Sequence, residues 1–318
     1  MFTTSTQKRF WTFTEEQLRE RRTLANIKAR EARLEFAKPE EHDLFLSVDE
    51  EVLLIRIVER SALKFSDMFQ PPMWNSVRWT AYMYYKRLFL DWSTMDNMPK
   101  VAMMACFYLA MKTDEFFVTI EEFVNNLTSG TPEQNQTRIL SMEPEIMRSL
   151  NYQLTVHCPY RPFEGFIMEI KTKMLLNFDV ESIRPPAEDF FTKCLFGDVM
   201  LMYPPSQIAL AAIKFGLDFI QKPHEVLSEF IYKLMGVEED SRRNQAELVA
   251  HADKCLSRLN EIVANVKKTS SMIDQEAQKR LLDRANNLAA LQTTLDNRRF
   301  LARGQERRRE DPIDSDDE

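Results

Sequence analysis

The sequence predicts an all-α protein, because its composition favours helices and because a long apolar run has almost no β-branched residues. Only 6 of 318 residues are glycine, and helix-favouring Leu, Met, Ala, Glu, Lys and Arg are plentiful. Residues 101–111, VAMMACFYLAM, are apolar throughout and are followed at once by Lys112, Asp114 and Glu115. A helix that is apolar on every face lies inside a bundle, and this one is too short to cross a bilayer. We therefore expect a central core helix, opened by Pro99, whose C-terminal end brings Lys112 to the surface.

Charge and cysteine content exclude several classes of protein. The formal net charge is −7, from 42 basic and 49 acidic residues, so the overall balance does not favour binding to a nucleic-acid backbone. Cys106, Cys158, Cys194 and Cys255 are scattered, without a CxxC pair or a histidine at ligand spacing. We expect free thiols, no metal and no cofactor. The charged N-terminus lacks the apolar region of a signal peptide, which indicates a reducing compartment, either cytosol or nucleus.

The N-terminal part is predicted as a polar, mobile stretch over residues 1–11 followed by a helix from Glu15 to about Phe36, capped by Thr12 or Thr14. This helix is too polar to form a core alone and must pack against other parts of the chain. Its candidate packing residues are Leu18, Leu24, Ile27, Leu34 and Phe36.

Trp11, with Lys8 and Arg9 nearby, forms an aromatic and basic patch. Two interpretations are open. The tryptophan either packs against the start of the following helix, or the three residues contact a partner protein.

Five helices are expected in the next hundred residues. Ser47 and Glu50 form a capping box for the first, which Pro71 and Pro72 end, and Ser76 caps the second. The core helix is the third. The fourth covers 119–127, residues 129–136 are a polar loop, and the fifth covers 138–150.

The pattern then starts again after a connector over residues 152–161. Pro162 opens a first helix, residues 187–203 form a second, and Pro205 opens a third. The apolar run that Pro205 opens follows the one opened by Pro99 by about 106 residues and has the same ordinal position, which indicates an internal repeat. Two further helices, over 223–235 and 243–266, complete the second unit.

A last helix from Asp274 to about Ala302 is weakly amphipathic through Ile273, Ala277, Leu281, Leu288, Leu291 and Leu295. The end of the chain is a basic cluster and then an acidic tail, which its composition predicts to be disordered. Ser315 in this tail is a candidate phosphorylation site because of its acidic context, and Ser5 is a second candidate.

The predicted domains are therefore residues 1–46, an N-terminal tail and helix; 47–156, the first repeat; 157–268, the second repeat; 269–303, the C-terminal helix; and 304–318, the charged tail.

Two five-helix repeats flanked by extra helices resemble the cyclin fold. KRLFL at 86–90 and ACFYLAMKTDEFF at 105–117 look like a cyclin box, and the resemblance covers about residues 48–266. Three further pieces, QKRFWTF at 7–13, HCPYRPFEGF at 157–166 and YPPSQIAL at 203–210, are similar to the H-type transcriptional cyclins. The last two are also similar to the C-type cyclins of the Mediator kinase module, so that subfamily is the alternative.

The resemblance implies a kinase-binding site. Lys112 and Glu143 match the lysine and glutamate that, in cyclins, bind the start of the kinase's regulatory helix. The apolar residues around them are Leu109, Phe116, Tyr152 and Leu154, and Asp114 with Glu115 form an acidic rim. The simpler alternative is a partly exposed ion pair that contributes only ~0 to 1 kcal/mol to stability. Pro144 departs from the family pattern, because a proline inside the fifth helix would kink it or begin a new helix.

The implied function is that of a non-catalytic subunit that activates a cyclin-dependent kinase, as in the CDK-activating kinase of the transcription factor TFIIH. The implied partners are the kinase, a RING-finger assembly factor and the TFIIH core, and the implied location is the nucleus. No nucleic acid or membrane is expected as a partner. An enzyme is not supported by any phosphate loop or catalytic triad in the sequence. A DNA-binding cyclin-like protein of the TFIIB type is opposed by the acidic balance, although residues 298–309 are rich in arginine.

Overall fold

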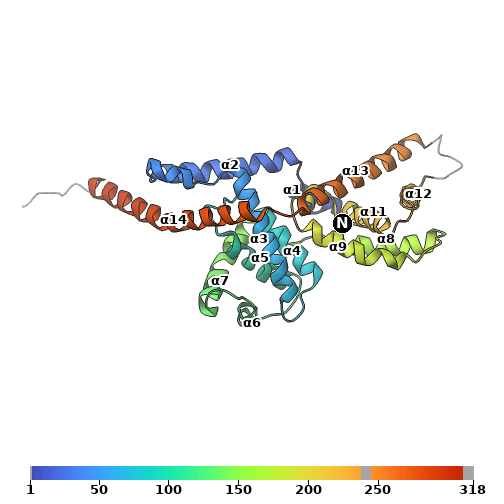
Figure 1. Ribbon diagram of the computed structural model, residues 1–318, viewed down its shortest axis with the longest axis horizontal. Helices are drawn as coiled ribbons and strands as arrows, with labels where there is room; N and C mark the ends of the chain where they lie inside the picture. Colours follow the sequence, from blue (N-terminus) through green and yellow to red (C-terminus); the bar gives the residue numbers. More distant parts are fainter. Residues whose placement is uncertain (1, 238–244, 311–318) are drawn as a thin grey trace, which may run out of the picture. The chain divides into compact units, whose positions relative to one another are not determined.

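The computed structural model describes residues 2–237 and 245–310, with side chains described as far as Leu301. These ranges contain α-helices and short 3-10 helices and no strand, which confirms the predicted all-α class (Figure 1). No described helix combines the length and the apolar character needed to span a membrane. Contacts divide the chain into two compact units: unit 1 holds residues 1–17, 58–88 and 100–272, and unit 2 holds residues 18–57, 89–99 and 273–318.

The first helices of unit 1 surround α5, which covers Pro99–Thr113. Every residue of α5 from Ala102 to Met111 is buried, as the apolar run predicts. Helix α3 (Val48–Met68) contributes its second half to this unit, and α4 (Asn75–Leu88) is buried almost throughout. Phe107 of α5 packs edge-on against Phe65 of α3 and Tyr82 of α4, with ring centroids 5.5 and 6.0 Å apart. The core helix is therefore confirmed.

Helices α6 (Ile120–Asn125) and α7 (Pro132–Ser149) complete the first repeat. The prediction of a loop over 129–136 was wrong at its end, because α7 begins at Pro132 rather than near Arg138. The Thr131 side chain accepts a hydrogen bond from the backbone N–H of Gln134, and proline at the first helical position lacks only an N–H that has no partner within the helix. Helix α7 also continues through Pro144 instead of starting afresh there.

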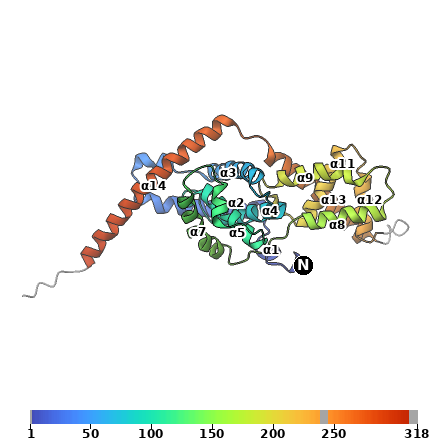
Figure 2. The ribbon, with the colours of Figure 1, turned by 90° about the horizontal axis from the view of Figure 1, so that it is seen from below.

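The second repeat consists of α8 (Tyr160–Lys173), η3 (Val180–Ile183), α9 (Arg184–Cys194), α10 (Val199–Met202), α11 (Pro205–Phe219), α12 (Glu225–Leu234) and α13 (Ala246–Ser270). Helix α11 packs against α8, α9 and α13 (Figure 2). The single helix predicted over 187–203 is two helices. They are separated by a turn in which Gly197 has φ +79°, a conformation that ends a helix and favours glycine.

Two short helices lie within residues 2–10, where the sequence analysis predicted none. Phe2–Thr4 form the 3-10 helix η1 and Thr6–Phe10 form α1. The backbone N–H of Phe13 donates to the carbonyl of Leu201, 2.9 Å away. These contacts hold the segment against the rest of unit 1.

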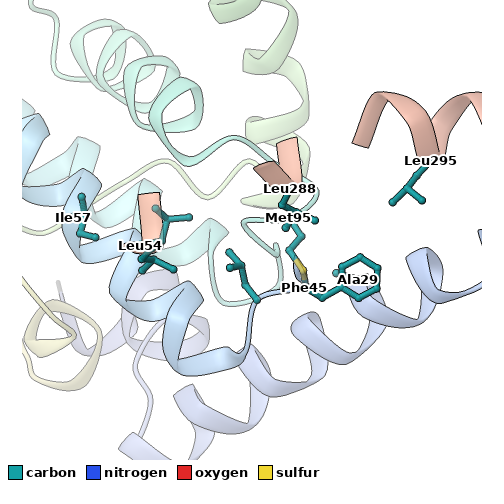
Figure 3. Close-up of a cluster of buried hydrophobic side chains, with 9 residues drawn as sticks. Ala29, Phe45, Leu54, Ile57, Met95, Leu288 and Leu295 are labelled. Atoms are coloured by element: carbon teal, nitrogen blue, oxygen red, sulfur yellow. The ribbon is translucent and has the colours of Figure 1, made fainter. Parts of the chain in front are cut away.

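Unit 2 contains α2 (Glu15–Leu34) from Leu18 onward, η2 (Pro39–Leu44), the first half of α3 and α14 (Gln275–Glu310). Figure 3 shows its core, which these elements and the turn carrying Met95 share. Helix α14 contributes Leu281, Leu288 and Leu295, one residue every seven positions. These three leucines of the predicted apolar face are confirmed as buried, whereas Ala277 is exposed. The helix extends to Glu310, beyond the predicted end near Ala302.

The predicted packing face of α2 was partly wrong. Leu18, Ala25 and Ala29 are buried, but Leu24, Ile27 and Leu34 are exposed. Two polar side chains occupy the buried face instead and fix its orientation. Asn26 donates to the Leu46 carbonyl and to Glu51, each over 2.9 Å, and Arg33 pairs with Asp96 at 2.8 Å.

Candidate functional site

Lys112 and Glu143 form an ion pair between α5 and α7, as expected for two neighbouring helices. The Lys112 side chain is 44% exposed and that of Glu143 is 11% exposed. The Lys112 ammonium also lies 4.7 Å from the centroid of the Tyr108 ring, one turn earlier on α5. Since the lysine is the more exposed partner, the pair presents a positive charge at the surface above a nearly buried carboxylate.

The proline beside Glu143 does not prevent this contact. Pro144 is exposed within a continuous α7, and its carbonyl accepts a bond from the Arg148 side chain at 3.3 Å. Burial, together with the negative charges of Glu143 and Glu121, raises the pKa of Tyr108 above its ordinary value.

The acidic rim lies where α5 ends. Glu115 has a left-handed backbone with φ +57°, and the Phe116 N–H returns to the Met111 carbonyl over 2.9 Å. The Asp114 carboxylate is half-buried and accepts a bond from the Thr80 hydroxyl at 3.3 Å, whereas Glu115 is exposed. Glu115 is therefore the more exposed of the two acidic residues.

Two exposed aromatic residues beside this rim were missed by the sequence analysis. Phe116 is buried, and its ring lies edge-on against Trp74, with centroids 5.1 Å apart. Trp74 itself is exposed, and Phe117 is 92% exposed. Two consecutive phenylalanines after a charged turn were the available signal, since neighbouring residues at the end of a helix point in different directions.

The predicted apolar residues of the site differ in how far they are exposed. Tyr152 is 66% exposed, and Leu154 is half-buried with its carbonyl accepting a bond from the Tyr84 hydroxyl. Leu109 is buried in α5. Leu109 and Phe116 therefore support the site from beneath, whereas Tyr152 and part of Leu154 lie at its surface.

The three candidate partner-contacting residues near the N-terminus also differ in exposure. Lys8 and Arg9 are exposed, but Trp11 is only 4% exposed and its indole N–H donates to the Gln153 side chain. Ser5 caps α1: its hydroxyl oxygen accepts from the Lys8 N–H at 3.2 Å. Ser315 lies outside the described residues.

The site has charged and aromatic side chains at its surface. No group of three or more His, Cys, Asp or Glu suited to a metal ion occurs within residues 2–237 and 245–301. A lysine and a glutamate side by side can bond carbonyls and amides of a partner's backbone, and the exposed rings beside them provide apolar contact area.

The sequence matches two protein families, the cyclin N-terminal domain over residues 73–155 and the cyclin C-terminal domain over residues 158–274. Cyclin-H of Xenopus laevis is 38% identical over 217 residues, which cover 67% of this chain and 67% of the relative. The chain belongs to the cyclin H family. Cyclin-H1-1 of Arabidopsis thaliana is 30% identical over 240 residues, covering 67% of this cyclin and 69% of the plant protein.

Solved structures share the fold of this cyclin. A chain of the yeast TFIIK (Kin28/Ccl1/Tfb3) complex superimposes with a TM-score of 0.64 and 21% identity, covering 83% of this cyclin and 99% of that chain. A chain of the CAK complex of Chaetomium thermophilum superimposes with a TM-score of 0.70 and 21% identity, covering 100% of this cyclin and 97% of that chain. By comparison, an RNA polymerase II holoenzyme cyclin-like subunit of Aspergillus clavatus is 26% identical over 253 residues, covering 79% of this cyclin and 77% of the relative. The alternative C-type assignment is therefore not favoured.

Proposed function

We propose that this cyclin is the regulatory subunit that binds and activates a cyclin-dependent kinase of the CDK-activating type. Family membership supports a regulatory rather than a catalytic role. The related folds come from kinase complexes, TFIIK with Kin28 and the CAK complex, which supports this kind of kinase as the partner.

The observation that carries the proposal is the Lys112 and Glu143 pair with exposed Tyr152, Phe117 and Glu115. In the cyclin family the matching pair binds the start of the kinase's regulatory helix. Here the exposed lysine can donate to carbonyls at one end of such a segment, while the glutamate accepts from its amides.

Activation then follows from the preference of this surface for one kinase conformation. The surface binds the regulatory helix in its inward position, in which a kinase glutamate pairs with the lysine that contacts ATP. A ligand shifts an equilibrium only by the difference in its affinity for the two states, so a tenfold preference changes their ratio about tenfold. Residues outside the kinase's catalytic centre can in this way control its activity.

We also propose a RING-finger assembly factor and the TFIIH core as partners, and the nucleus as the location. The yeast complex contains a third protein, Tfb3, and the Aspergillus relative is named for the RNA polymerase II holoenzyme, which supports a role in transcription. The expected kinase targets are the activation segments of other kinases and the repeat tail of RNA polymerase II.

The test is affinity purification of the full-length wild-type chain beside Lys112→Ala and Glu143→Ala, with identification of the copurifying proteins and a kinase assay. Lys100→Ala and Glu145→Ala are matched controls. Lys100 is an exposed lysine at the other end of α5, bonded to Ser129, and Glu145 is an exposed glutamate of α7.

We expect a kinase with TFIIH components to copurify with the wild type and the controls, and to be reduced in the two site variants. Mediator subunits in their place would move the assignment to the C-type cyclins. Recovery of no kinase with the wild type would contradict the proposed function. Equal recovery of the kinase with all variants would contradict the proposed site.

A further inference from the structure

The N-terminal segment, residues 2–13, contacts the connector that follows Tyr152. The indole N–H of Trp11 donates to Oε1 of Gln153 over 2.6 Å. The backbone N–H of His157 donates to Oε1 of Gln7 over 2.7 Å, and the Phe2 ring lies edge-on to the His157 ring at 5.9 Å. Two side chains of the segment thus bond two separate points of the connector.

Both side chains that make these bonds are withdrawn from water. Trp11 and Gln7 are buried, so water cannot easily replace a lost partner. Trp11, for which packing within the chain and a partner contact were both open, is therefore bonded within its own chain.

The connector is also held from the other side, by α4. The Arg87 guanidinium lies 5.0 Å from the centroid of the Trp11 ring, and its Nη1 donates to the Gln153 carbonyl over 3.0 Å. Gln153 is thus fixed at two points, its side chain by Trp11 and its carbonyl by Arg87. The next carbonyl, that of Leu154, accepts the Tyr84 hydroxyl.

The backbone just before this clamp is unusual. Asn151 and Tyr152 are consecutive non-glycine residues in the left-handed region, with φ +51° and +56°. Such residues keep this conformation only where surrounding contacts hold it. Tyr152 is also the most exposed of the aromatic and leucine residues that the family pattern places in the kinase-binding site. Its N–H bonds the Met147 carbonyl over 2.9 Å at the end of α7, so the residue lies between this helix end and the clamped Gln153.

We propose that the N-terminal segment is a positioning element, which holds the connector so that Tyr152 and Leu154 face the kinase. Trp11 and Gln7 are positioning residues that act through Gln153 and His157 and do not themselves touch the kinase. This inference rests on the proposed function, because it assigns the segment a role in presenting that same site.

The experiment compares the full-length wild-type chain with Trp11→Phe, Gln153→Leu, the double variant and Gln153→Glu. Trp11→Phe keeps an aromatic ring against Arg87 and removes the indole N–H together with the five-membered ring. Gln153→Glu keeps an acceptor for it. Phe10→Ala is the matched control, because Phe10 is an exposed aromatic of the same segment.

Two quantities are measured: the dissociation constant for the kinase recovered with the wild type, and the hydrogen-exchange rate of the His157 and Gln153 amides in the free chain. We expect Trp11→Phe and Gln153→Leu each to weaken kinase binding roughly three- to tenfold, as for loss of one hydrogen bond, and to speed exchange in the connector. The double variant should be no weaker than the poorer single variant, since both remove the same bond. Gln153→Glu and Phe10→Ala should bind as the wild type does.

Outcomes separate this inference from the proposed function. Unchanged binding of Trp11→Phe and Gln153→Leu, with Lys112→Ala weakened, overturns the positioning role alone. Weakening by Phe10→Ala as large as that by Trp11→Phe overturns it too, because the segment would then contact the kinase directly. If the wild type recovers no kinase, the proposed function fails and the inference fails with it. Should Trp11→Phe fold poorly, the contrast between Gln153→Leu and Gln153→Glu decides.

Discussion

Replacing Lys86 by methionine tests how far the interior of unit 1 depends on one ion pair. Lys86 of α4 pairs with Glu59 of α3, and the two side chains are only 1% and 2% exposed. Glu59 also accepts a bond from the backbone N–H of Gly197 at 3.4 Å, so the carboxylate joins α3 and α4 to the turn after α9. Burial raises the pKa of Glu59, against the opposing effect of Lys86.

The size of the effect follows from this burial. Lys86→Met removes the cation and leaves a carboxylate without a counter-charge, which costs about 3–5 kcal/mol of stability. The double variant Glu59→Leu with Lys86→Met removes both charges, and buried pairs replaced by apolar side chains are often neutral in stability. We expect the double variant to be more stable than the single by at least about 2 kcal/mol.

The single variant should also depend on pH in a defined direction. With Lys86 gone, the pKa of Glu59 rises further above its ordinary value near 4.5, so the native state holds a proton that the unfolded state releases. The stability of Lys86→Met is therefore greatest below the ordinary pKa of about 4.5. Between this pKa and the raised pKa of the native state, stability falls as pH rises, by at most about 1.4 kcal/mol per pH unit.

Urea denaturation of the full chain, followed by circular dichroism at about pH 5 and about pH 8, measures both effects. Lys100→Met is the control, because this exposed lysine should change stability by no more than about 0.5 kcal/mol. A double variant as unstable as the single, or a single variant with no pH dependence beyond that of the wild type, would refute the reasoning.

Three further predictions concern backbone strain, acid stability and thiol reactivity. Gly197→Ala should lower the melting temperature more than Gly236→Ala does. Both glycines have φ near +78°, within a degree, but only at Gly197 would the new Cβ lie 2.7 Å from a threonine side chain. Equal shifts in melting temperature would contradict this prediction. Hydrogen bonds from Arg184 and Lys171 lower the pKa of Glu181 to about 2, so its stabilising effect, present above its ordinary pKa of 4.5, is lost as pH falls toward 2. Glu181→Gln should flatten the acid limb of a melting-temperature profile, whereas parallel profiles would disprove a role for this carboxylate. Burial raises the pKa of the Cys106 and Cys194 thiols well above their ordinary value. Iodoacetamide at about pH 8 should therefore label them only on unfolding. Labelling of these two cysteines in the native chain at the rate of a free thiol would refute this prediction.

Much of the candidate site could be predicted from sequence because it is tied to local patterns and to a family motif. The apolar run of α5 places Lys112 at its C-terminal end, and the resemblance to the cyclin family pointed to Glu143 on a neighbouring helix. The two adjacent phenylalanines were a signal for an aromatic surface, but the sequence does not show that Phe116 packs inward and Phe117 outward, or that Trp74 lies beside them.

The helical class, the two repeats and the core helices were predictable, since they depend on composition, proline positions and the spacing of apolar residues along the chain. The burial of Trp11, the exposure of Leu24 and Ile27 of α2, and the break at Gly197 before α11 became visible only in the folded chain. The burial of one side chain depends on hydrogen bonds and packing with residues far away in the chain. The partner of Trp11 is Gln153, and Asn26 turns the face of α2 toward Leu46 and Glu51. Such pairings leave no periodic signal in the sequence.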